Sequence, residues 1–240
     1  MPSQIGSRMA FQNAANAVKR AGLNPGNAVL SQSYLRLEVP LATSATSYKF
    51  DVLVNESTNG TINTQQKLNL QDAFVANQIG FYLAVPTSTT STAFRLLTYP
   101  AVNSTTLTTG TTLCFSQTEA VQAYAIYNGY MQLTVNQRTV ITAWDLQRHL
   151  FIPPVQLASN ASASTAVLAA VGTAAGHMND DNYNAADMGL FPTEPNVVLA
   201  GNKKNDLTVT FPAGPSAIPT NSRLVCIIRG ILAQNVTPIN

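Results

Sequence analysis

Charged side chains are scarce in this sequence. Asp, Glu, Lys and Arg make up 10% of the 240 residues, against roughly 25% in an ordinary soluble domain. A free monomer keeps its neighbours away with surface charge of both signs, and this chain has little of it. The net charge of +2 also argues against a fold that as a whole neutralises nucleic-acid phosphates. We therefore expect other subunits to cover much of the surface, and no sequence-specific nucleic-acid binding.

Residues that build metal and redox sites are equally few. The two histidines, His149 and His177, stand in none of the spacings typical of zinc sites. We expect the His149 ring to lie at the edge of a strand or turn and to be satisfied locally. The two cysteines, Cys114 and Cys226, form no CxxC pair, and the sequence does not decide whether they meet. Buried free thiols are the favoured interpretation.

Motifs of known enzymes are missing as well. The sequence contains no GxSxG, Walker A or GxGxxG pattern, so serine hydrolysis, phosphoryl transfer by a P-loop and dinucleotide binding lack support. A loop near His177 carries three acidic residues that could bind calcium through carboxylate oxygens: Asp180, Asp181 and Asp187. Their spacing matches no EF-hand loop, so we expect no catalytic site and no cofactor, with a structural calcium ion as the weaker alternative.

Long hydrophobic runs are absent too. No segment approaches the roughly 18 apolar residues that cross a membrane, and the first 20 residues lack the continuous apolar stretch of a signal peptide. We therefore expect the chain to be made and kept in a cytoplasm.

The first feature that the chain does have is one N-terminal helix. Residues 3–22 are rich in alanine, with apolar residues three and four apart. Gly22 suits a left-handed helix end, and Asn24-Pro25-Gly26 prevents continuation. Three basic residues accompany the apolar stripe: Arg8, Lys19 and Arg20. The helix could lie on an anionic membrane surface or the inner face of a shell, and docking under a sheet or on a neighbouring subunit is an equal alternative.

The rest of the chain has the texture of an all-β sandwich or barrel, because short alternating runs are separated by Pro, Gly, Asn and Thr clusters. We expect strands at residues 34–41, 47–55, 64–70, 74–85, 93–99, 120–127, 130–135, 139–144, 207–211 and 223–233. The five apolar residues 224–228 predict a central strand that is buried on both faces.

Four segments are expected outside the sheets. Residues 161–171 favour a short helix, and residues 176–195, with acidic residues among Asn, Gly and Pro, favour an ordered surface loop. The Ser/Thr-rich stretches 87–92 and 103–112 are expected to be exposed loops.

Several segments resemble the jelly-roll major capsid proteins of viruses. They are LNLQDAF at 68–74, IGFYL at 79–83, YNGYMQL at 127–133, WDL at 144–146 and FIPP at 151–154. More narrowly, a basic N-terminal helix, a β body with Ser/Thr-rich loops and very low charge resemble the small double jelly-roll capsid proteins of tailless icosahedral bacteriophages with an internal membrane.

That resemblance implies two eight-stranded sandwiches side by side. Residues 1–30 would be the helix and linker facing the particle interior, 31–136 the first jelly roll and 137–240 the second. Because about 210 residues would have to supply about sixteen strands, a single jelly roll with a large insertion is the alternative.

The resemblance also implies the function of a structural major capsid protein, located in the virion. Trimeric capsomers would assemble into an icosahedral shell around the genome, with neighbouring capsomers, penton and minor capsid proteins, and an internal lipid membrane as partners. The alternative is a receptor- or carbohydrate-binding β module of a phage spike or fibre. Sugars often stack on exposed aromatic rings, and we expect Trp144, the only tryptophan, to lie in the core, which weakens that alternative.

Overall fold

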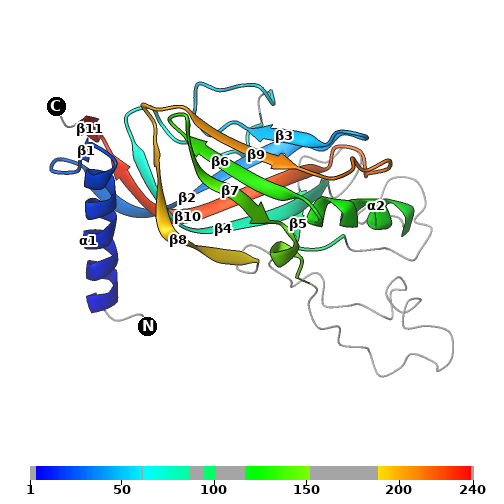
Figure 1. Ribbon diagram of the computed structural model, residues 1–240, viewed down its shortest axis with the longest axis horizontal. Coiled ribbons are helices and arrows are strands. Elements are labelled where there is room, and N and C mark those ends of the chain that lie inside the picture. The colour runs from blue at the N-terminus through cyan, green and yellow to red at the C-terminus, as the bar shows by residue number, and fades with distance from the viewer. Residues whose placement is uncertain (1–3, 61, 87–93, 101–116, 152–188, 239–240) are drawn as a thin grey trace.

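The computed structural model describes residues 4–60, 62–86, 94–100, 117–151 and 189–238. Within them the chain is mostly antiparallel β-sheet, which confirms the all-β class (Figure 1). The strands are β1 (Leu23–Asn24), β2 (Val29–Pro40), β3 (Ser47–Phe50), β4 (Ala73–Pro86), β5 (Phe94–Leu97), β6 (Tyr130–Val135), β7 (Arg138–Asp145), β8 (Leu190–Ala200), β9 (Asn205–Thr210), β10 (Arg223–Gln234) and β11 (Thr237–Pro238). The helices are α1 (Gln4–Arg20), α2 (Gln117–Tyr127) and a 3-10 turn, η1 (Gln147–His149).

The strands form two larger sheets and one small β1-β11 pair. One larger sheet runs β2-β10-β4, and both β8 and β5 pair with the other side of β4. The second sheet runs β3-β9-β6-β7. Both sheets combine strands from either side of residue 136, since β10 lies between β2 and β4, and β9 between β3 and β6. The expected division into one sandwich at 31–136 and another at 137–240 is therefore wrong for these strands.

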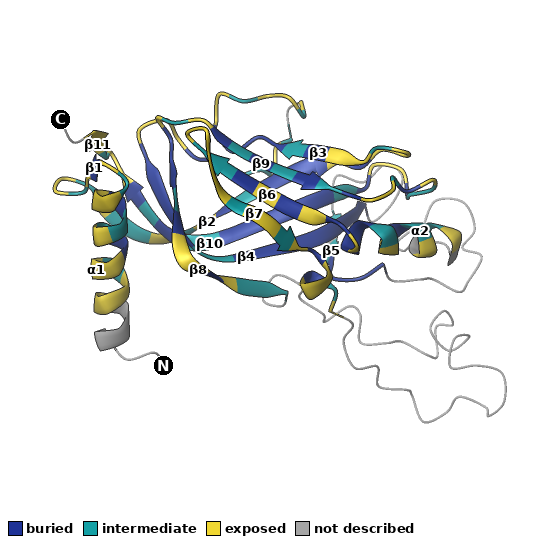
Figure 2. Cartoon of the chain, in the orientation of Figure 1, coloured by how far each residue is buried: buried dark blue, intermediate teal, exposed yellow. Residues whose placement is uncertain are grey.

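The main core lies between the two sheets, where their inward faces meet (Figure 2). Its large side chains come from strands of both sheets, as Phe50 and Phe81 illustrate with ring centroids 6.2 Å apart. This core is built by alternation, because every second residue of a strand points to the same face.

Strand β10 is buried on both faces, as the five apolar residues 224–228 predict. Leu224, Cys226 and Ile228 point into the main core. Val225 and Ile227 point the other way, into a second cluster with Tyr82. The prediction of a central strand is confirmed.

Helix α1 is also confirmed, and it ends as expected before Gly22, whose φ is +81°. Its buried stripe consists of Ala14 and Val18, which pack with Leu23, Val75 and Ile231 on the outward face of the β10–β4 sheet. The last turns of α1 are thus docked, whereas its first turns project beyond the sheets (Figure 1).

The segment predicted as a strand at 120–127 is instead the helix α2. Its buried residues Ala123, Ile126 and Tyr127 are three and four positions apart, which is the spacing of one helix face. The sequence alone did not show this face, because Gln122 is the only polar residue between 120 and 127 and the run has no clear strand or helix period.

Two further expectations need correction. Strand β8 begins inside the stretch 176–195 that was expected to be a loop. Its prolines, Pro192 and Pro195, are tolerated because β8 pairs only with β4 and so lies at an edge. Residues 64–70 form only isolated bridges, Arg36 with Gln66 and Leu53 with Leu68. The expected helix 161–171 and the loops 87–92 and 103–112 lie outside the described residues.

Candidate assembly surface

The basic residues of α1 are all exposed on the helix. Arg8 and Lys19 are about three helical turns apart, so they lie on the same side of the helix. Arg20 follows about 100° further round the axis. The chain has no acidic residue before Glu38, so no carboxylate on α1 itself neutralises this charge. Met9, 59% exposed, lies beside Arg8 near the projecting end.

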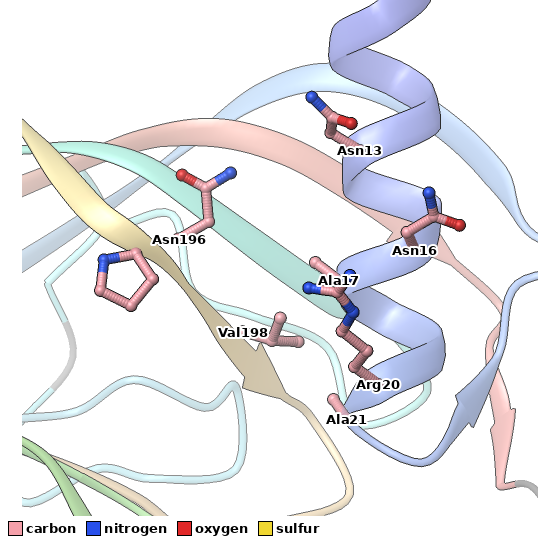
Figure 3. Close-up of a pocket in the computed structure, with 8 residues that line it drawn as sticks. Asn13, Asn16, Ala17, Arg20, Ala21, Asn196 and Val198 are labelled. Carbon is pink, nitrogen blue, oxygen red and sulfur yellow. The ribbon is translucent and has the colours of Figure 1, made fainter.

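An open groove of about 440 Å³ separates α1 from β8. It is lined by Asn13, Asn16, Ala17, Arg20 and Ala21 from the helix, and by Pro195, Asn196 and Val198 from the strand (Figure 3). Three carboxamides and one guanidinium there can donate hydrogen bonds to carboxylate or phosphate oxygens. The structure therefore brings Arg20 to this groove, while Arg8 and Lys19 remain outside it.

The sequence did not reveal this groove. Asn196 lies on β8, a strand that was not predicted because it contains two prolines. The approach of α1 to β8 is a tertiary contact between segments far apart in the chain. The asparagines of α1, on a helix without acidic residues, were the one sequence feature that could have indicated a polar groove there.

Helix α2 offers a second exposed surface that the sequence did not reveal. While Ala123, Ile126 and Tyr127 face the core, Val121 is 63% exposed and Tyr124 is 38% exposed. A helix with apolar residues on all sides is typically buried, so this outward face suits contact with another subunit.

His149 is a core residue and not part of an exposed site. Trp144 Nε1 donates a hydrogen bond to His149 Nε2 at 2.8 Å, and His149 Nδ1 lies 2.7 Å from the Gly189 carbonyl oxygen. The indole fixes Nε2 as the acceptor, so Nδ1 carries the proton and donates to Gly189. Phe81 and Phe191 pack edge-on against the ring. The ring is hydrogen-bonded as expected, but only Trp144 is a local partner, since Gly189 lies 40 residues further along the chain. The ring is also fully buried instead of lying at an edge.

Acid is expected to destabilise the fold through His149. Burial lowers its pKa from 6.5 to about 4, although the hydrogen bond with Gly189 acts in the opposite direction. Between pH 6.5 and 4 the unfolded chain binds a proton that the folded chain does not, so the free energy of unfolding falls by about 3 kcal/mol in total. Urea unfolding at several pH values measures this loss.

His149→Gln is the matched variant, because the amide keeps one donor and one acceptor but does not titrate. It is expected to show a shallower loss of stability over the same pH range. An identical pH dependence in the two proteins would contradict the assignment to His149.

The remaining sequence candidates are placed only in part. Asp180, Asp181, Asp187, His177 and Cys114 lie outside the described residues. Cys226 is a fully buried free thiol, and burial raises its pKa well above the usual range. Across the ranges that the structure describes, no group of three or more His, Cys, Asp or Glu side chains is placed to hold a metal ion.

No family model, curated protein or solved structure was found that matches the chain. Neither α1 nor α2 is long and apolar enough to cross a membrane.

Proposed function

We propose that this chain is the subunit of a viral capsid and that its β body is a single jelly roll. The observation that carries the proposal is the strand order. Three short strands are set aside: the β1-β11 pair and the four-residue β5, which pairs with β4 beside β8. Numbered along the chain, the other eight strands (β2, β3, β4, β6, β7, β8, β9 and β10) lie in the orders 1-8-3-6 and 2-7-4-5. Strand 1 thus pairs with 8, 2 with 7, 3 with 6, and 4 with 5. This nested pairing is what a long hairpin gives when it rolls up, as in a jelly roll.

A jelly roll alone does not define the function, because lectin and cupin domains share it. The low charge and the outward apolar residues of α1 and α2 favour a structural role in which copies of the chain pack against one another in a shell. Trp144 is not suited to stack on a bound sugar, because it is partly buried and donates its N–H to His149. The Arg148 guanidinium also lies 4.4 Å from its ring centroid. The spike or fibre module therefore remains the weaker alternative.

In the proposed shell, α1 faces the particle interior. Its docked turns hold it on the subunit, and Arg8, Lys19 and Arg20 then face an anionic surface such as lipid headgroups. Each basic residue contributes about 1 kcal/mol at most near such a surface, so one chain binds weakly. Many copies in a shell bind together far more strongly.

The proposal predicts a homotrimeric capsomer in solution, with neighbouring capsomers, penton and minor capsid proteins as later partners. Sedimentation velocity of the purified chain at micromolar concentrations is expected to show a trimer. A species of 25.5 kDa that persists across the concentration range would contradict it.

A further inference from the structure

One stretch of one sheet edge lacks the usual protection against pairing with another chain. Edge strands are normally protected by short length, proline, bulges or charge. Among the described strands, β3 and β5 have four residues each, β8 contains two prolines, and the ladder of β7 with β6 shifts register twice. By contrast, the twelve residues of β2 pair with β10 without any shift.

Part of the β2 edge is already occupied within the subunit. Arg36 donates its N–H to the Gln66 carbonyl at 3.0 Å, and Gln66 N–H returns a bond of 2.8 Å. Both backbone groups of Arg36 therefore point away from β10. Because this orientation alternates along a strand, Leu30, Gln32 and Tyr34 also present their N–H and C=O groups to the open edge. Within the described ranges, no segment pairs with them there.

The sequence of this open stretch is symmetric about Gln32. Residues 30–34 read Leu-Ser-Gln-Ser-Tyr, so an apolar residue and a serine flank the glutamine on each side. A two-fold contact uses the same surface on both partners, and every residue must suit its symmetry mate. A reversed copy of this segment meets that condition.

We propose that β2 pairs with β2 of a second copy of this chain, antiparallel and centred on Gln32. Gln32 then faces Gln32 of the other copy, Leu30 faces Tyr34, and Ser31 faces Ser33. Leu30, Gln32 and Tyr34 each donate one N–H and accept one bond across the axis, so the unpaired backbone groups of the stretch are satisfied. The pairing ends where Gln66 occupies the edge, and the β10–β4 sheets of two subunits become continuous.

The side chains of the pair are compatible with this contact. Tyr34 is 52% exposed, and Leu30 already packs partly against the cluster under α1. The tyrosine of one copy would cover the leucine of the other on the same face, an aromatic–aliphatic cross-strand pair. No charged side chain lies between residues 29 and 35, so nothing in the segment repels its own copy.

Disulfide trapping tests the contact and its register. Hydrogen-bonded residues across an antiparallel pair have Cα atoms about 5.5 Å apart, within the span of a disulfide. Oxidised Gln32→Cys is expected to give a covalent dimer on a non-reducing gel. A mixture of Ser31→Cys and Ser33→Cys chains is expected to cross-link more readily than either chain alone. Gln132→Cys, exposed on β6 of the other sheet, is the matched control and carries the same native cysteines.

Two substitutions test whether the contact needs the Gln32 backbone and side chain. Gln32→Lys places two ammonium groups at the axis, and Gln32→Pro removes an N–H that points away from β10, so both are expected to fold. In the background of either one, the cross-link between Ser31→Cys and Ser33→Cys chains is expected to be lost. A cross-link that survives, or one no stronger at Gln32→Cys than at Gln132→Cys, overturns the inference.

The outcome is separable from that of the proposed capsid role. Trimers without a Gln32 cross-link would overturn the β2 contact and leave the capsomer in place. A cross-linked dimer that forms no trimer would support the β2 contact and overturn the trimeric capsomer.

Discussion

Replacing Ile227 with Asp is expected to leave the chain unable to fold. Ile227 is 7% exposed on the central strand β10 and packs with Tyr82, Ala84 and Val225. The one basic residue directly across the ladder, Arg36, already binds Glu38 at 2.6 Å. The new carboxylate would therefore be buried without a free partner, at a loss of about 4 kcal/mol or more, which is a large share of the roughly 5 to 15 kcal/mol that stabilises a typical domain.

The measurement is soluble expression followed by circular dichroism. Ile228→Asp gives the same test on the other face of β10, where Leu35 and Ile79 lie opposite. Ile227→Val is the control and is expected to remain folded, with a loss of about 1 kcal/mol. Native-like, soluble Asp variants would show that the interior of the sheet is wrongly assigned.

Deleting residues 1–22 is expected to abolish normal particle assembly while the β body still folds. The helix contributes Ala14 and Val18 to the smaller cluster with Val75 and Ile231, whereas the main core between the sheets contains no residue of α1. Loss of the helix therefore exposes one apolar patch, at about 2 kcal/mol for the burial of Val18. The β-sheet dichroism is expected to remain, and assembly or membrane attachment is expected to fail.

A charge-reversed full-length chain separates the charge of α1 from its docking. Arg8→Glu, Lys19→Glu and Arg20→Glu change only exposed positions, so α1 is expected to stay docked. Binding to anionic vesicles is expected to be lost, with neutral vesicles as the control. Loss of the β-sheet dichroism in the truncated chain, or normal particles from it, would contradict this role of α1.

The pattern of neighbouring residues predicted those elements whose environment in the fold is the one that the pattern indicates. The residues 224–228 are apolar without interruption, and β10 has both faces covered. Gly22 and Asn24-Pro25-Gly26 end α1 by backbone geometry alone. These features depend on a few neighbouring residues, so they can be predicted from the sequence without knowledge of the tertiary contacts.

The errors arose where tertiary contacts decide the outcome. α2 was misassigned because Gln122 is the only polar residue in the run 120–127, so the run shows neither the strand nor the helix period clearly. β8 was missed because Pro192 and Pro195 are acceptable only at an edge, and position in a sheet is not local information. The boundary at residue 136 failed for the same reason, since pairing of β10 with β2 joins opposite ends of the chain.

The central claim is that copies of this chain assemble with one another into a capsid, and negative-stain electron microscopy of the purified protein tests it most directly. The account predicts discrete trimeric capsomers or closed shells of uniform diameter. A field of isolated monomers, from a protein that binds glycans, would contradict the capsid role and favour the carbohydrate-binding module.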